Sequence, residues 1–164
     1  MVISSIFSSY DESLLVGKDL DFFSIDWYES DKRILRKKTE KGIDIAIKRG
    51  IPILPLLHHD ILLCEGNTVV LIVVKPCECI VIYPRNPMEI GTVCYDIGNK
   101  HIPISLNEKE IVLPFDKPTF FLLEKNGFEL KVETRIFNNQ LRNNIPQHAH
   151  QTDTLFDKLI KLTQ

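Results

Sequence analysis

The segment from Thr68 to Val74 constrains the fold most, because it is an unbroken run of β-branched and aliphatic residues (TVVLIVV). A run of this length between turn signals predicts a strand that is buried on both faces. Glu65-Gly66-Asn67 supplies the turn signal before it, and Lys75-Pro76 follows it. Proline cannot donate a backbone hydrogen bond to a sheet, so we predict a lobe boundary at Lys75-Pro76.

The residues before this boundary, 1–75, predict a small all-β lobe. Ile43, Ile45 and Ile47 alternate with Asp44 and Ala46, which is the period of a half-buried strand. Residues 1–19 are Ser-rich in patches, and we predict a poorly structured lead-in there.

Residues 76–137 follow a different pattern and predict a ferredoxin-like βαββαβ lobe, which makes the chain an α+β protein. Pro87 opens a helix that Gly98-Asn99 ends, and Asp116 caps a second helix that Gly127 closes in a left-handed conformation. The strands predicted around these helices are Cys79–Tyr83, Ile102–Leu106, Ile111–Leu113 and Leu130–Ile136.

Residues 138–164 predict a flexible tail, because the chain turns polar after Phe137. The tail contains His148-Ala149-His150 and, from Asp153 to Leu162, a short one-sided apolar stripe. Ten residues are too few for a stable isolated helix. The stripe therefore orders against a partner, or it packs permanently on its own subunit; the sequence leaves both alternatives open.

Charge and hydropathy exclude several functions. The net charge is −2, from 20 basic and 22 acidic residues, so nothing favours nucleic acid or an anionic membrane as a ligand. The longest apolar run, Val69 to Val74, is too short to span a bilayer. Met1 to Tyr10 lacks the features of a secretory signal, so we expect a cytoplasmic protein with its four cysteines reduced. The spacings of the cysteines include no C-x₂-C pair, so they do not predict a structural zinc site.

The histidines are the candidate metal ligands. Adjacent side chains of an extended segment point to opposite faces, so His58 and His59 should be a poor chelating pair in a solvated turn. His101 follows a helix end, where a histidine ordinarily serves only as a cation near the helix dipole. His148 and His150 are two residues apart and can face the same ion, although a solvated tail explains them equally well.

One stretch of the sequence changes how these histidines are interpreted. The residues Tyr95 to Pro103 (YDIGNKHIP) resemble the signature of the UreE family of urease accessory nickel chaperones. The N-terminal lobe resembles that family too, at Arg33, Thr39, Gly42, Arg49-Gly50 and Asp60-Ile61-Leu62, so the likeness covers about Phe22 to Phe137. The tail departs from many relatives, since it holds two histidines rather than many, and Phe115-Asp116-Lys117 lacks the histidines that some relatives carry there.

The resemblance implies a nickel metallochaperone and not an enzyme. It implies a homodimer in which the His101 side chains of both subunits meet at the two-fold axis, with His148 and His150 as further ligands. Neutral imidazole suits Ni²⁺, and Zn²⁺ or Cu²⁺ would compete for the same site. The implied partners are the nickel-loading accessory GTPase and the apo-urease maturation complex. The sequence contains no P-loop, nucleophile elbow or H-E-x-x-H motif, so no known catalytic motif argues for an enzyme.

A second hypothesis is a peptide-binding or co-chaperone module with secondary metal binding, because the family's N-terminal lobe resembles the substrate-binding lobe of a chaperone. A basic cluster would dock the partner, unless it is simply a solvated hairpin. Its members are Lys32, Arg33, Arg36, Lys37, Lys38 and Lys41. A ferredoxin-like enzyme or an RNA binder is disfavoured, because neither a phosphate loop nor an RNP1-like strand is present.

Overall fold

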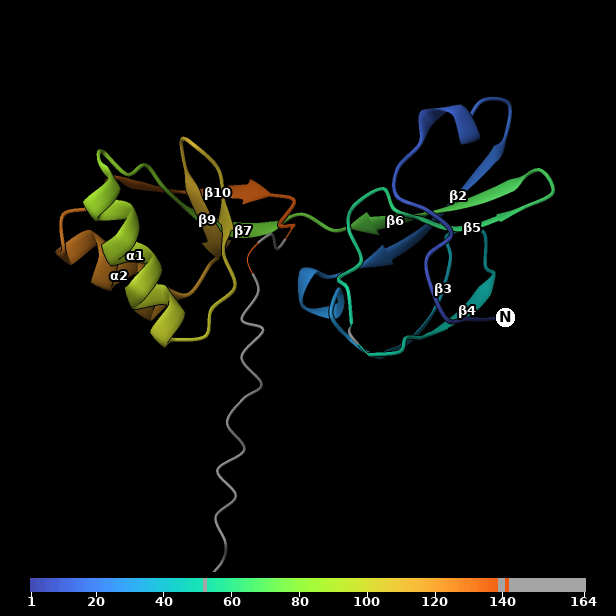
Figure 1. The fold of residues 1–164 in the computed structure, drawn as a ribbon, viewed down its shortest axis with the longest axis horizontal. Helices are drawn as coiled ribbons and strands as arrows, with labels where there is room; N and C mark the ends of the chain where they lie inside the picture. Colours follow the sequence, from blue (N-terminus) through green and yellow to red (C-terminus); the bar gives the residue numbers. More distant parts are fainter. Residues whose placement is uncertain (52, 139–140, 142–164) are drawn as a thin grey trace, which may run out of the picture.

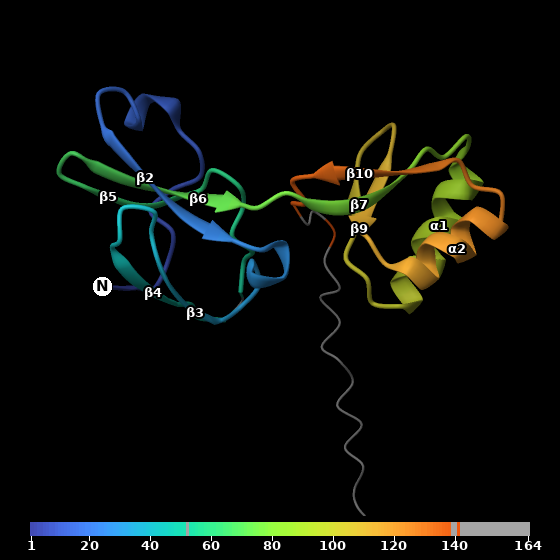
Figure 2. The same ribbon diagram turned by 180° about the vertical axis from the view of Figure 1, so that it is seen from behind.

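The computed structural model describes residues 1–51, 53–138 and 141, and it is an α+β structure made mostly of strands with two α-helices. Strands β1 to β6 gather on one side of the molecule, and β7 to β10 with both helices gather on the other (Figures 1 and 2). The chain crosses between the two sides at Lys75-Pro76, which separates β6 from β7.

The first side contains two three-stranded sheets, ordered β1-β4-β3 and β2-β6-β5. In the second sheet β6 runs parallel to β2 and antiparallel to β5. The strands are β1 (Val2–Ile3), β2 (Asp19–Ile25), β3 (Ile34–Lys38), β4 (Asp44–Lys48), β5 (Ile61–Glu65) and β6 (Thr68–Val74), with short 3₁₀ helices at Glu12–Leu14 and Trp27–Glu29.

Strand β6 is the centre of this side, and its predicted burial on both faces is confirmed. Val70, Ile72 and Val74 belong to one apolar cluster, which also contains residues of β3 and β4. Val69 and Leu71 belong to another cluster on the opposite face. Alternate residues of a strand point to opposite faces, and both faces of β6 pack on apolar clusters, so Val69 to Val74 contains no polar residue.

The prediction of a poorly structured lead-in over residues 1–19 is wrong. Val2 and Ile3 pair with Ala46 and Ile47 in parallel register. Farther along, Ile6 packs on one core, and Leu14 and Leu15 pack on the other. These apolar residues are too widely spaced to form a periodic pattern. Apart from the 3₁₀ helix that Asp11 caps, contacts with distant strands give the segment its structure.

The second side is one four-stranded antiparallel sheet, ordered β10-β7-β9-β8. Both helices lie against one face of it (Figure 1). Their buried residues, among them Val93, Ile97 and Leu123, pack on Ile80 and Ile82. The elements are β7 (Cys77–Ile82), α1 (Pro87–Asn99), β8 (Ser105–Leu106), β9 (Ile111–Pro114), α2 (Lys117–Lys125) and β10 (Leu130–Arg135).

The predicted helix starts are confirmed, and one predicted strand is shorter than expected. Asp116 caps α2 by accepting a 3.0 Å hydrogen bond from the Thr119 amide, and Gly127 has a φ of +77°. The strand predicted from Ile102 is confined to Ser105–Leu106. Pro103 has no amide hydrogen for a ladder, and Ile102 packs into the core beneath the helices.

Candidate functional site

His101 lies immediately beyond the C-terminal end of α1, in a conformation that the sequence does not reveal. The helix runs through Asn99, and Lys100 is its cap with a φ of −90°. His101 then has a φ of +56°, and its amide donates to the Gly98 carbonyl at 3.0 Å. Gly98-Asn99 was predicted to end the helix, and the helix does end at Asn99.

The imidazole of His101 is exposed, while its neighbour Lys100 fastens the turn to α2. The Lys100 Nζ donates to the Thr119 Oγ1 at 3.0 Å, and that hydroxyl donates to the Asp116 Oδ2 at 2.5 Å. The Thr119 hydrogen bond holds the pKa of Asp116 below its ordinary value. The turn that presents His101 is therefore anchored on both helices.

The end of the described chain lies close to this turn. Phe137, just after β10, is buried against Cys79, Val81 and Val112 on the sheet face opposite the helices. The Leu141 amide then donates to the Ile104 carbonyl at 3.3 Å, three residues after His101. The tail therefore starts beside the His101 turn. His148, His150 and the segment from Asp153 to Leu162 lie outside the described residues.

His58 and His59 do not point to opposite faces, so that prediction is wrong. Their ring centroids lie 3.9 Å apart, and the His59 ring also contacts Tyr10 at 5.5 Å. His59 has a φ of +73°, which removes the extended geometry that would separate the two rings.

His58 connects three segments that are distant in the sequence, a role that its sequence context did not indicate. Its Nδ1 accepts a 3.1 Å hydrogen bond from the Val74 amide at the end of β6. Its own amide donates to the Asn138 Oδ1 at 3.2 Å, just after β10. Because Nδ1 accepts, the ring is a neutral imidazole that carries its proton on Nε2.

Acid should weaken this connection. Burial, followed by the charge of His59, lowers the pKa of His58. A lowered histidine pKa means that the folded state prefers the neutral ring, so stability is greatest above pH 6.5 or so and falls as the pH drops toward the folded-state pKa. We expect His58→Gln to reduce the loss of unfolding free energy between pH 7.5 and 5.5 by up to about 1 kcal/mol, because the ring is only partly buried.

Urea unfolding at the two pH values measures this loss. His59→Gln is the matched control, because it leaves the bond between His58 and Val74 in place and should keep most of the acid sensitivity. An identical pH response of His58→Gln and the unchanged protein would contradict the assignment.

The basic cluster is largely neutralised by neighbouring carboxylates. Lys32 and Lys37 both pair with the buried Glu29. Arg36 pairs with Asp44 at 2.6 Å, and Lys41 pairs with Asp19. The surface is therefore less positive than six basic residues within ten positions suggest.

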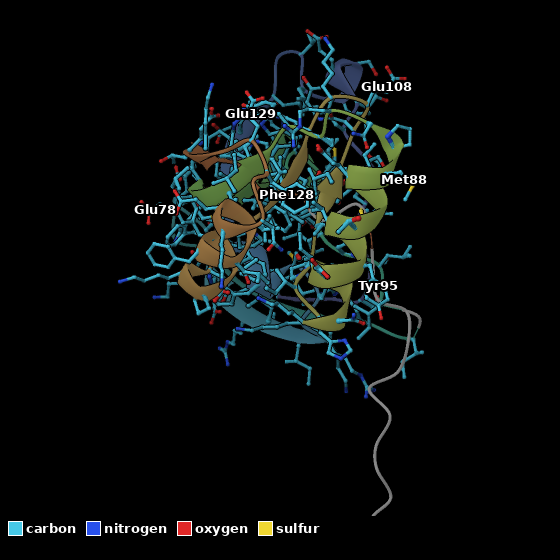
Figure 3. The ribbon with its side chains drawn as sticks, turned by 90° about the vertical axis from the view of Figure 1, so that its left-hand side faces the viewer. Glu78, Met88, Tyr95, Glu108, Phe128 and Glu129 are labelled. Carbon is cyan, nitrogen blue, oxygen red and sulfur yellow. The ribbon has the colours of Figure 1, made fainter. Side chains whose placement is uncertain are left out.

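The outer face of α1 is exposed and partly apolar. Met88 and Tyr95 are 79% and 71% exposed, and both lie along the outer side of the helix in Figure 3. Between them are the exposed Gly91 and Thr92, and a Cβ added at Gly91 would meet no atom within 4 Å. On this face two small exposed residues therefore separate two large exposed side chains.

The described part of the chain brings no large group of metal-ligating side chains together. Among residues 1–51, 53–138 and 141, no three His, Cys, Asp or Glu side chains form a group that could hold a metal ion. The same part of the chain has no helix that is long and apolar enough to cross a membrane.

Known proteins resemble this chain over its whole length. The model of the "UreE urease accessory protein, C-terminal domain" matches residues 77–157. A urease accessory protein UreE of Flavobacterium johnsoniae is 34% identical over 166 residues, which is all of both chains. That of Acetivibrio thermocellus is 31% identical over 92% of this chain and 97% of its own length. That of Helicobacter pylori strain P12 is 36% identical over 75% of this chain and 72% of its own length.

Together with a site that exposes one histidine at a helix end, these matches define an accessory protein and not an enzyme. The chain belongs to the UreE family of urease accessory proteins, which confirms the resemblance carried by Tyr95 to Pro103.

Proposed function

We propose that the protein is a cytoplasmic nickel chaperone in urease maturation, in which two copies of the chain bind one Ni²⁺ between their His101 side chains. The observation that carries the proposal is the placement of His101: an exposed imidazole on a turn anchored to both helices. A helix C-terminus favours a bound cation. Imidazole suits Ni²⁺, and Zn²⁺ or Cu²⁺ would compete for the same ligands.

A homodimer supplies the second exposed His101 side chain that one chain lacks. A two-fold interface presents the same residue twice, so a single exposed histidine becomes a pair. The outer face of α1 supports such a contact, because Met88 and Tyr95 expose large side chains beside the open position at Gly91. Helix α1 leads directly into the His101 turn, so dimerisation through it brings the two imidazoles together.

The tail supplies the remaining ligands in this proposal. Leu141 is paired with Ile104, which is at most about 10 Å along the chain from His101. His148 lies seven positions after Leu141, and an extended chain of seven residue steps spans about 24 Å. His148 and His150 are therefore within reach of the His101 pair, and a tail that arrives and leaves allows both capture and release.

The finer organisation follows from the same assignment. Residues 76–137 form the ferredoxin-like lobe that binds the metal, residues 1–75 form the β lobe for a partner, and residues 138–164 form the metal-delivering tail. The recipients are the nickel-loading accessory GTPase and the apo-urease complex. They are proposed because the relatives are named urease accessory proteins.

The alternative function, a peptide-binding module, rests on a different observation. A cavity of about 260 Å³ lies on the first side of the molecule, lined mainly by residues 4–6, 49–51 and 54–56. Ile51 and Leu54 are exposed at 83% and 71%, so apolar surface is available to an extended peptide. Binding of a partner that does not depend on nickel would favour this alternative.

Calorimetric nickel titrations test the proposal. The full chain should bind one tight nickel per dimer, and a chain ending at Leu141 should bind it more weakly, because two imidazole ligands are missing. The matched control is the full-length double variant His148→Ala/His150→Ala. It should behave like the shortened chain if the histidines, rather than the rest of the tail, supply the ligands. One tight nickel per monomer at high dilution would refute the shared site.

A further inference from the structure

Two cysteines on β7 form a cluster that the nickel site does not use. Cys77 and Cys79 are two positions apart, so they lie on the same face of the strand, and their Sγ atoms are 3.7 Å apart. Cys79 is fully buried and Cys77 is half-buried. The face is the one opposite the helices, where Val81, Val112 and Phe137 pack around them.

We propose that Cys77 and Cys79 form a second metal site, for a soft thiophilic cation of the copper(I) type. Thiolates select soft ions such as Cu(I), whereas Ni²⁺ at the His101 pair is served by imidazole. Two metal–sulfur bonds of about 2.3 Å span at most about 4.6 Å in a line. The two sulfur atoms therefore need to separate by less than about 1 Å to hold a two-coordinate ion.

Arg135 on β10 partly offsets the charge of the bound complex. Binding converts two thiols and one Cu⁺ into a copper dithiolate with one negative charge and releases two protons. Arg135 lies opposite Cys77 across the strands, and its guanidinium, which also pairs with Glu133 and Glu110, favours the thiolate of Cys79. The Arg135 amide also donates a hydrogen bond that favours this thiolate.

The surroundings restrict which ions bind. Burial raises the pKa of Cys79 to about 12, and burial likewise raises the pKa of Cys77. Both groups are therefore protonated at neutral pH, and only an ion with strong affinity for sulfur displaces the protons. Since two protons leave for each ion, the copper affinity should rise about 100-fold per pH unit near neutrality.

The chain carries its own reporter for this site. Trp27 is the single tryptophan of the sequence, and it packs against the cluster that contains Cys79. Its ring lies 5.7 Å from that of Phe137. A copper ion between the two sulfur atoms is close enough to this cluster to change the fluorescence of Trp27.

The test is an anaerobic Cu(I) titration of the full chain against a colorimetric copper(I) chelator, with Trp27 fluorescence recorded in parallel. The unchanged protein should take one Cu(I) per chain from the chelator. Cys77→Ser and Cys79→Ala should lose this uptake and the fluorescence change. Cys94→Ser, which removes a partly buried thiol on α1, and His101→Gly should retain both.

Circular dichroism identifies the variants that fold, and Cys77→Ser carries the test if Cys79→Ala fails to fold. The proposal is overturned if a folded Cys77→Ser protein still binds Cu(I) with unchanged affinity. It is equally overturned if copper(I) uptake is lost in His101→Gly and kept in the cysteine variants, because the histidine pair would then be the copper site.

Discussion

Replacing His101 by glycine should abolish the tightest nickel binding and at the same time raise the free energy of unfolding. The two effects have separate causes. The imidazole is the ligand in the proposed site, so its removal from both subunits leaves at most the tail histidines. The backbone of His101 has a φ of +56°, and a side chain in this conformation costs roughly 1–2 kcal/mol that glycine does not pay.

The opposite signs make this variant more informative than His101→Ala. Alanine would keep the strained φ, so His101→Ala brings no gain in stability, and a folding defect could then account for a loss of binding. Glycine relaxes the turn that Lys100 and Thr119 hold in place. A gain in stability measured by urea unfolding, together with lost nickel affinity measured by calorimetry, assigns the loss to the imidazole alone.

The chain offers a matched control at His59, which is also an exposed histidine with a positive φ, of +73°. His59→Gly should gain stability for the same backbone reason and keep the tight nickel site. If His101→Gly retains unchanged nickel affinity, or if His59→Gly loses it, His101 is not the central ligand.

Replacing Tyr95 by glutamate should prevent dimerisation and, through it, the tight nickel site. Tyr95 is 71% exposed in the single chain, so the substitution should leave the fold intact. At a two-fold contact through α1 the new carboxylate would be buried near its own copy. An unpaired buried charge typically costs 3–5 kcal/mol, which corresponds to a dimer weakened by about 100-fold or more.

Analytical ultracentrifugation with and without nickel measures the association, and calorimetry measures the metal. Tyr28→Glu is the control, because Tyr28 is 57% exposed on the other side of the molecule, after β2. The variant Tyr28→Glu should dimerise and bind nickel normally. A Tyr95→Glu protein that still forms the nickel-bound dimer would show that the two-fold contact uses another surface.

The sequence by itself determined the elements whose signals are local. The run TVVLIVV predicts β6 because six successive apolar residues, Val69 to Val74, favour burial on both faces of the strand. Pro87 predicts the start of α1, because the amides in the first turn of a helix have no partner within the helix and proline lacks one. Asp116 predicts the start of α2, because its carboxylate accepts a hydrogen bond from an amide of the first turn. His101 was found by its neighbours in the stretch Tyr95 to Pro103.

Tertiary structure alone decided the features that depend on distant contacts. Residues 1–19 contact β4, β5 and the two apolar cores, and no local periodicity of the sequence predicts these contacts. The rings of His58 and His59 meet because His59 adopts a positive φ, and His58 is held by Val74 and Asn138, 16 and 80 residues away. Phe137 packs on the sheet face opposite the helices, and Leu141, four residues later, bonds to Ile104. Local propensity sets where helices and strands begin, but the free energy that fixes turns and chain ends comes from packing between segments that are far apart in the sequence.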